Sequence, residues 1–286
     1  MATSAKKKEV LRLSYAWLMD EAEGVLFGVG YFRRGPTSKA TYGTSRIPPL
    51  IGRSFGLEAY NPAPSPPTSG CVIELELFGA SGAAPLPAGV CLLEGFAVPC
   101  EAALLTDIGR VVAAAPFRHM ITPGGQRMSA AMTNCGSAGW ISDRSGYRYA
   151  GLDPHSGQPW PALPESFSTL ARQAAEAAGF AGFAPDACLI NRYVPGARMS
   201  LHQDRDEREL SAPIVSVSLG LPAVFLLGGL ERSARPVRVP LAHGDVIVWG
   251  GAARMIFHGV APVAEGLHPG LGRQRINLTL RRAWRD

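Results

Sequence analysis

The second half of the chain is divided into short segments rich in β-branched residues, and this pattern restricts the fold more than any other feature. Gly, Pro, Asp and His, which favour turns, separate the segments. The segments that read as strands are 187–194, 212–220, 223–229, 237–241, 244–251, 253–260 and 275–283. Many short strands at close spacing are typical of an antiparallel barrel or sandwich.

Two segments before these strands have the apolar spacing of amphipathic helices. They are residues 98–117 and 164–180, and the second ends at Gly179. We expect both helices to cover one sheet. The predicted fold class is therefore α+β, mainly β, with two covering helices at the N-terminal side of the strands.

Residues 1–70 differ from the rest of the chain. Residues 6–32 predict a short helix and a strand, and the Pro- and Ser-rich stretch 61–70 has the composition of a linker. We place a domain boundary there, with an N-terminal extension over 1–70 and the main domain over 71–286. The extension carries no motif, and a small adaptor, a disordered tail and sequence upstream of a mis-assigned start all remain open.

Composition sets outer limits on function. Hydrophobic residues make up 47% of the chain, enough for a sizeable core. The net charge is +5, but residues 1–70 contribute nine basic against five acidic residues, and the remainder nineteen against eighteen. A nucleic-acid face on the main domain must therefore be a local patch.

Cysteine usage and the N-terminus bear on the compartment. The five cysteines are scattered without a CxxC motif, which favours free thiols in a reducing compartment. No stretch approaches the roughly 20 apolar residues of a membrane span, and the basic N-terminus lacks the pattern of a secretory signal. We expect a cytoplasmic protein without a membrane partner.

The stretch SLHQDRDE, residues 200–207, places a histidine and three carboxylates in eight positions. In an extended segment His202 and Asp204 point to the same face, and His258 lies in a later strand-like segment. Two histidines and one carboxylate can occupy one face of an octahedral iron and leave three positions open. Zinc with the same ligands is an alternative.

The C-terminal segment RINLTLR alternates in polarity. Arg275, Asn277, Thr279 and Arg281 share one face of a strand, and apolar residues take the other. An arginine fork matches a carboxylate. The two arginines are six residues apart, roughly 20 Å in a strand, so they cannot grip the same end of a small dianion. Either each arginine reaches one end, or one acts from the side.

Several long motifs resemble those of the AlkB family of iron(II)- and 2-oxoglutarate-dependent DNA-repair dioxygenases, and of its bacterial members in particular. The resemblance covers about residues 75–283, with the motifs in the family's order. They are FRHMITPGGQRMSAAMTNCGSAGW, GYRYAGLDPHSGQPWPALPESF, LINRYVPGARMSLHQDRDE, APIVSVSLGLPAVF, GDVIVWGGAARMIFHGV and RINLTLR.

The resemblance implies a double-stranded β-helix, or jelly roll, with one Fe(II) per subunit held by His202, Asp204 and His258. It implies that 2-oxoglutarate and O2 are cosubstrates. Arg275, with Tyr193 and Asn277, would meet the far carboxylate of 2-oxoglutarate. Arg281 and Asn191 would lie near the carboxylate that chelates iron, so Arg281 would act from the side.

The resemblance also implies the substrate. The enzyme would hydroxylate the N-methyl group of 1-methyladenine or 3-methylcytosine in single- or double-stranded DNA, releasing formaldehyde, succinate and CO2. Such a base must leave the duplex or come from a single strand. Trp140 and the imidazole of His202 would sandwich it, and Asp206 would favour its positive charge. Glu207 would be solvated rim. The other implied substrate contacts are Tyr147 and Tyr149 to phosphate, and Thr122, Met132, Arg232 and Arg205.

Two alternatives are open on the sequence. The same oxygenase chemistry could act on RNA, tRNA or a protein, and activity on methylated oligonucleotides against peptides would separate these. A catalytically silent nucleic-acid-binding module would predict a damaged metal triad, whereas the triad is intact. We expect a monomer.

Overall fold

The computed structural model describes residues 12–20, 25–33, 41–44 and 85–284, and the chain divides into two units, 1–83 and 84–286. In the first unit, β1 (Arg12–Asp20), β2 (Val25–Arg33) and β3 (Thr41–Thr44) form an antiparallel sheet in that order. The prediction of a helix within residues 6–32 is therefore wrong for residues 12–20 and 25–32, which form strands. The alternation of Leu13, Tyr15 and Trp17 has the period of a strand, and this competing signal prevailed.

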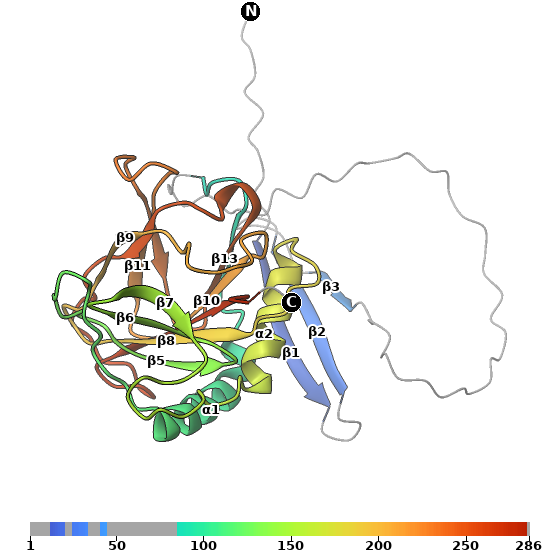
Figure 1. Cartoon of the computed structure of the whole chain (residues 1–286). Coiled ribbons are helices and arrows are strands. Elements are labelled where there is room, and N and C mark those ends of the chain that lie inside the picture. The colour runs from blue at the N-terminus through green and yellow to red at the C-terminus, as the bar shows by residue number, and fades with distance from the viewer. Residues whose placement is uncertain (1–11, 21–24, 34–40, 45–84, 285–286) are drawn as a thin grey trace, which may run out of the picture. The chain divides into compact units, whose positions relative to one another are not determined.

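The second unit contains two antiparallel sheets that face each other (Figure 1). The larger sheet has the strand order β4-β13-β10-β15-β8-β5, and the smaller sheet has the order β12-β11-β14-β9. The larger sheet comprises β4 (Val90–Leu93), β5 (Ala131–Gly136), β8 (Ala187–Tyr193), β10 (Ile214–Gly220), β13 (Val246–Trp249) and β15 (Arg275–Arg281). The smaller sheet comprises β9 (Met199–His202), β11 (Ala223–Leu227), β12 (Val237–Leu241) and β14 (His258–Val260). This is the jelly roll that the family resemblance implied, and it agrees with the antiparallel barrel or sandwich predicted from the strand pattern.

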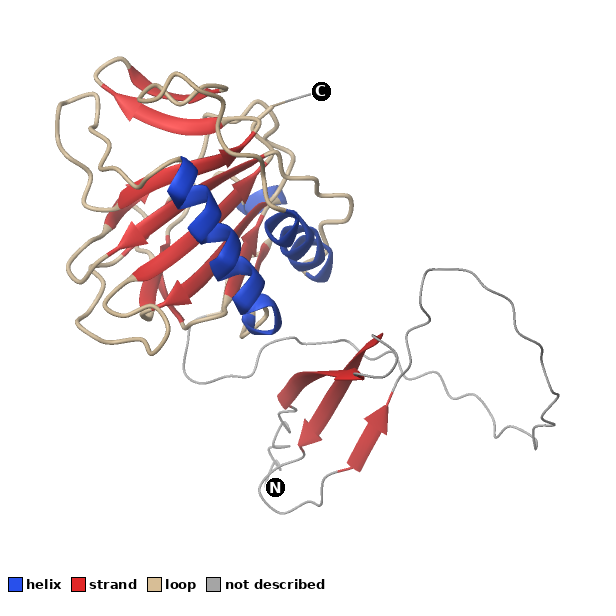
Figure 2. Ribbon diagram, turned by 90° about the horizontal axis from the view of Figure 1, so that it is seen from below, coloured by secondary structure: helices blue, strands red, loops and turns tan. Residues whose placement is uncertain are grey.

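Two helices cover one face of the larger sheet (Figure 2). They are α1 (Glu101–Ala114) and α2 (Glu165–Ala177). In α1 the buried side chains Leu104, Ile108 and Val111 recur at intervals of four and three residues, so they form one apolar stripe toward the sheet. Both helices lie where the amphipathic segments were predicted, and they end a few residues inside the predicted limits.

The strands of the larger sheet separate two hydrophobic layers. On β10, Val215, Val217 and Leu219 pack in the layer beneath the helices. Ile214, from the same strand, packs in the layer between the two sheets. Because side chains alternate across a strand, the helix layer closes one face of the larger sheet with apolar contacts, and the other face is directed toward the interior of the jelly roll.

A separate hairpin lies beside the sheets (Figure 1). It consists of β6 (Gly139–Asp143) and β7 (Gly146–Ala150), paired in register from Gly139↔Ala150 to Asp143↔Gly146. The sequence pattern did not predict β4, β5, β6, β7 or β9. The strand expected over 253–260 is limited to β14, because the 3-10 turn Gly251–Ala253 and Arg254 precede it.

Leu278→Ala should destabilise the domain, because Leu278 is 0% exposed in the layer between sheet and helices. We expect the free energy of unfolding in urea to fall by about 2–5 kcal/mol. Leu267→Ala is the matched control, since Leu267 is 77% exposed, and it should change stability by less than about 0.5 kcal/mol. Equal losses in the two variants would contradict this division of the core.

Candidate active site

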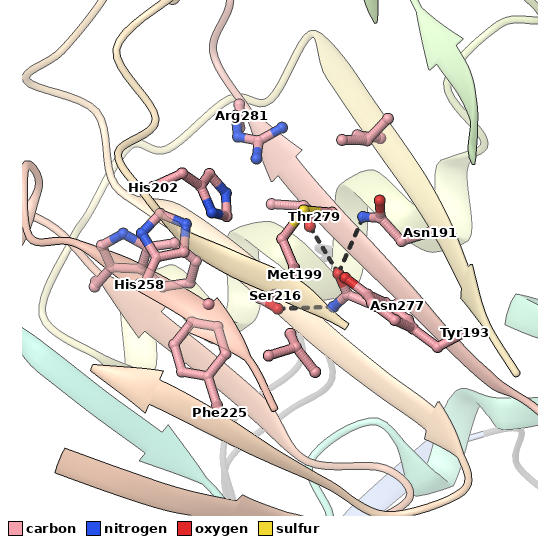
Figure 3. Close-up of a pocket in the computed structure, with 14 residues that line it drawn as sticks. Asn191, Tyr193, Met199, His202, Ser216, Phe225, His258, Asn277, Thr279 and Arg281 are labelled. Carbon is pink, nitrogen blue, oxygen red and sulfur yellow. Dashed lines mark hydrogen bonds between the residues drawn. The ribbon is translucent and has the colours of Figure 1, made fainter. Parts of the chain in front are cut away.

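A cavity opens between the two sheets (Figure 3). The polar side chains in its wall come from both sheets. They are those of Asn191, Tyr193, His202, Ser216, His258, Asn277, Thr279 and Arg281.

The alternation of β15 explains why so much polarity lies inside the barrel. Ile276, Leu278 and Leu280 pack beneath the helices, whereas Asn277, Thr279 and Arg281 line the cavity. All seven residues of β15 are buried. The polar face predicted from the sequence is therefore an interior face.

His202, Asp204 and His258 converge at one end of the cavity. The antiparallel pairing of β9 with β14 sets His202 opposite His258, and Asp204 follows two residues after β9. The His202 Nε2 and His258 Nε2 atoms each lie 3.6 Å from a different oxygen of Asp204, and one ligand atom from each residue lies within 4.8 Å of the others. A single ion can therefore touch all three residues.

The close approach of β9 and β14 depends on Gly259. A Cβ atom at this position would lie 2.6 Å from the main-chain oxygen of Met199 on β9. Any larger residue would push the two strands apart, and with them the two histidines. The glycine beside His258 is therefore part of what builds the ligand set.

Backbone hydrogen bonds set the orientation of both imidazoles. His202 Nδ1 lies 2.9 Å from the main-chain oxygen of Ser200, and His258 Nδ1 lies 3.2 Å from that of Ile256. A carbonyl oxygen only accepts, so each Nδ1 must carry the proton. In the neutral form of each ring, Nε2 then carries the lone pair, as in protein metal sites where the other ring nitrogen is held by hydrogen bonding.

The protonation states at this site also favour a metal. Burial would raise the pKa of the Asp204 carboxyl, but the Arg281 guanidinium and the two histidines hold that pKa well below its usual range. Arg281 Nε and Nη2 both donate to Asp204 Oδ2, at 2.9 and 2.6 Å. Desolvation, followed by the charge of His258, lowers the pKa of His202 to about 4. Asp204 is thus charged and His202 neutral near pH 7, the forms in which they bind metal.

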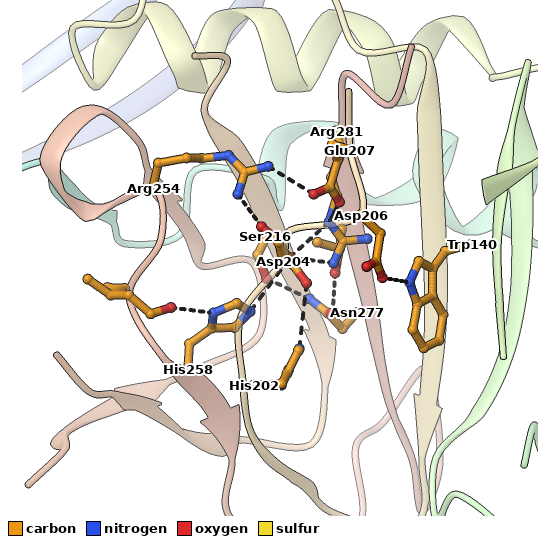
Figure 4. A network of polar contacts seen from close by, with 12 residues as sticks. Trp140, His202, Asp204, Asp206, Glu207, Ser216, Arg254, His258, Asn277 and Arg281 are labelled. Carbon is orange, nitrogen blue, oxygen red and sulfur yellow. Dashed lines mark hydrogen bonds and ion pairs between the residues drawn. The ribbon is translucent and has the colours of Figure 1, made fainter. Parts of the chain in front are cut away.

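Glu207 lies behind the triad rather than at a solvated rim (Figure 4). It is 6% exposed and is surrounded by Arg254 Nη2 at 3.1 Å, Arg281 Nε at 3.3 Å and the Tyr149 hydroxyl at 2.7 Å. The expectation that Glu207 is solvated was wrong. A polar residue in a turn is expected to be exposed. The sequence does not show that arginines from two distant segments surround Glu207.

Arg275 is a buried cation with unused hydrogen-bonding capacity. It is 1% exposed, its Nη2 donates to Ser218 Oγ at 2.9 Å, and its guanidinium lies 5.2 Å from the centre of the Tyr193 ring. Among the described residues, its Nε and Nη1 have no hydrogen-bond partner. Unpaired buried donors are costly, so these two atoms fit a carboxylate ligand such as that of 2-oxoglutarate.

Two amides extend this polar wall. Asn191 Nδ2 donates to Asn277 Oδ1 at 3.3 Å, while Asn191 Oδ1 accepts a hydrogen bond from none of the residues that the structure describes. Asn277 Nδ2 donates to Ser216 Oγ and to the main-chain oxygen of Val217. Asn277 is therefore fixed by its neighbours, and Asn191 retains an acceptor.

The hairpin β6–β7 brings aromatic side chains to the loop between β9 and β10, residues 203–213, which we call the metal loop. Trp140 Nε1 donates to Asp206 Oδ2 at 2.8 Å (Figure 4), and the Trp140 ring stacks on Tyr147 at 5.6 Å between ring centres. Tyr147 is exposed, whereas the Tyr149 hydroxyl donates inward to Glu207. Of the two tyrosines expected to contact phosphate, only Tyr147 has an exposed side chain.

The remaining predicted contacts are spread more widely. Met132 is fully buried in the layer between the sheets, and Thr122 Oγ1 accepts the Gln126 amide in a turn. Arg232 is exposed and lies 5.8 Å from the centre of the Phe257 ring. Arg205 is exposed and follows Asp204 directly in the metal loop.

The sequence pattern missed Arg254 and Ser218. Arg254 was included in a predicted strand, and its side chain is directed at the metal loop. Ser218 lies on the inward face of β10 opposite Asn277. Strand alternation would have indicated the inward position of Ser218, but no local signal marks the partners of Arg254.

Asp204→Asn should weaken metal binding by more than about 100-fold, because loss of a ligand should exceed the 10–100-fold cost typical of losing a residue that only supports a ligand. The measurement is titration of the metal-free protein with Mn2+ by isothermal calorimetry. His155→Ala, which removes an exposed histidine outside the triad, should leave the affinity unchanged. Tight binding by the Asp204 variant would exclude this centre.

Comparison with known proteins agrees with this geometry. Residues 89–281 match the model of the 2OG-Fe(II) oxygenase superfamily. The chain is 58% identical to the alpha-ketoglutarate-dependent dioxygenase AlkB of Salmonella typhimurium, and 55% identical to that of Escherichia coli K12. Each match spans 199 residues, 70% of this chain and 92% of the relative.

A solved structure supports the fold. The structure titled OsALKBH1 matches with a TM-score of 0.61 and 28% identity, over 70% of this chain and 99% of that chain. The His-Asp-His cluster lies inside the matched family region. The chain belongs to the 2OG-Fe(II) oxygenase superfamily, and within it to the AlkB family of alpha-ketoglutarate-dependent dioxygenases.

Proposed function

We propose that this dioxygenase repairs alkylated DNA by oxidative removal of the methyl group from 1-methyladenine and 3-methylcytosine. One observation carries the proposal: Asp204 of the metal triad lies in the same loop as Asp206, and Asp206 accepts a hydrogen bond from the indole of Trp140. The similarity to AlkB over most of the chain supports the same substrate class.

Fe(II), with 2-oxoglutarate and O2, supplies the oxidising chemistry and yields succinate, CO2 and formaldehyde. His202, Asp204 and His258 would hold the metal, and the two histidines also line the cavity. His258 and Asp204 are buried, which limits the access of water to their ligand atoms. The chain's part is orientation and exclusion of water.

Arg275 binds the far carboxylate of 2-oxoglutarate in this proposal, with Tyr193 and Asn277 beside it. Its two unpaired donors support the assignment. Arg281 acts from the side, near the carboxylate that chelates the metal, and Asn191 offers its unpaired oxygen nearby. The ion pair between Arg281 and Asp204 gives Arg281 a second task, to keep the ligand ionised.

The methylated base stacks between Trp140 and His202. The half-exposed His202 imidazole supports its role as one wall. A methylated adenine or cytosine of this kind is cationic, and the carboxylate of Asp206 favours it electrostatically. Tyr147, Thr122, Arg232 and Arg205 complete the proposed nucleic-acid contacts, whereas Met132 is 0% exposed and the Tyr149 hydroxyl is hydrogen-bonded to Glu207.

We further propose that residues 71–286 carry the activity as a monomer, and that 1–70 are not needed for catalysis. A cytoplasmic location is supported by Cys135 and Cys188, which face each other across β5 and β8 as free thiols. Among the described residues, no helix is long and apolar enough to cross a membrane.

The first test is mass spectrometry of a single-stranded DNA oligonucleotide carrying one 3-methylcytosine. Protein with Fe(II), 2-oxoglutarate and air should make the oligonucleotide lighter by one CH2 unit and release one succinate per methyl group. His202→Ala should abolish both products, and His155→Ala should retain them.

Other results of that experiment have distinct meanings. Succinate without demethylation would contradict the DNA substrate, and methylated RNA and peptides would be tried next. Neither product, from protein shown to bind iron, would refute the proposed activity.

Arg275→Met should raise the KM for 2-oxoglutarate by more than about tenfold, because the variant removes the buried charge that would pair with a carboxylate. Mn2+ affinity should stay unchanged, since Arg275 contacts Ser218 and Tyr193, which lie outside the triad. Steady-state succinate formation and calorimetry measure the two quantities. An unchanged KM would exclude Arg275 from the cosubstrate site.

A further inference from the structure

Arg254 is a buried cation outside the metal triad. It follows the 3-10 turn Gly251–Ala253 and precedes His258 by four residues. Its side chain is 4% exposed. A charged side chain this deeply buried is stable only when its donors are paired, so the identity of its acceptors indicates its role.

Three acceptors from the opposite segment surround the Arg254 guanidinium. Nη1 donates to the main-chain oxygen of Asp204 at 2.6 Å, and Nη2 donates to Glu207 Oε2 at 3.1 Å. Nε donates to the main-chain oxygen of Ala212 at 3.0 Å. The rigid fork of arginine can meet three acceptors in fixed directions, which a lysine ammonium cannot reproduce.

These contacts join the two segments that carry the ligands. Asp204 is itself a ligand, and its own carbonyl is held by a residue from the segment that leads to His258. Figure 4 shows Arg254 on the far side of Asp204 from His202. The Arg254 guanidinium thus holds the main chain of the metal loop at Asp204, on the side away from His202.

A series of buried ion pairs also connects Arg254 to the carboxylate of Asp204. Buried charges alternate along the series Arg254, Glu207, Arg281 and Asp204, with ion-pair distances of 3.1, 3.3 and 2.6 Å. Without Arg254, Glu207 would have one cation fewer beside it, and Arg281 would be drawn toward Glu207 and away from Asp204. Removing one partner of a buried pair leaves an uncompensated charge.

We propose that Arg254 is a positioning residue for the metal centre. It holds the main chain of Asp204 and neutralises Glu207, so that Arg281 stays directed at the Asp204 carboxylate. The inference rests on the metal site of the proposed function. It is tested by metal binding alone, so a wrong nucleic-acid substrate would not affect the outcome.

The main experiment titrates metal-free protein with Mn2+ by isothermal calorimetry, well below the unfolding temperature of each variant. Arg254→Met should weaken Mn2+ binding by about 10–100-fold, the range typical of residues that support metal ligands. Arg118→Met is the matched control, because Arg118 also forms a partly buried ion pair, 2.6 Å from Asp153, outside the metal loop. The control should bind Mn2+ as the parent protein does.

Arg254→Lys tests whether the planar guanidinium is needed. It also replaces Arg254→Met as the test if the methionine variant does not fold. It keeps the charge but loses the three fixed directions, so we expect a smaller loss of Mn2+ affinity, about 3–10-fold. Circular dichroism establishes that each variant is folded. Parent-like affinity in the lysine variant would overturn the proposed role of the guanidinium.

The double variant Arg254→Met with Glu207→Gln tests the charge balance. Neutralising Glu207 should restore part of the Mn2+ affinity lost in Arg254→Met, an effect that a merely structural role of Arg254 would not produce. A double variant that binds no better than Arg254→Met would overturn the charge-balance part. Equal losses in Arg254→Met and Arg118→Met would overturn the whole proposal.

Discussion

The ion pair between Arg281 and Asp204 is the interaction on which the rest of the site depends. Both groups are buried, and each alone would be strongly destabilising in that environment. Together they place a charged carboxylate next to the imidazoles of His202 and His258. The electrostatic state of the centre is therefore set by a residue at the end of β15, far along the chain from the ligand that it controls.

The strand β15 shows how one strand can serve a core and a site. Its apolar face anchors the two helices, and its polar face lines the cavity. The helix layer supplies the apolar contacts of that sheet, so the opposite face is free to carry arginine, asparagine and threonine. A strand with polar residues only at solvent would leave no place for a dianionic cosubstrate.

The features that could be predicted from the sequence were those set by short-range patterns. The spacing of His202 and Asp204, the alternation of RINLTLR and the two amphipathic helices all depend on neighbours within a few positions, and the structure has them as predicted. The roles of Glu207 and Arg254 could not be predicted, because they depend on contacts with residues about 50 to 75 positions away. The hairpin β6–β7 was missed because its register is settled by pairing rather than by an alternating apolar pattern.

The hydrogen bonds from His202 and His258 to the carbonyls two residues before them carry a further consequence. Each imidazole is oriented by its own stretch of three residues. The loss of rotamer freedom, a cost of up to roughly 1–2 kcal/mol for a side chain, is then incurred when the strands form rather than when an ion arrives. The metal-free protein is thus a preorganised receptor, and little of the ion's binding energy is diverted into ordering the side chains that hold it.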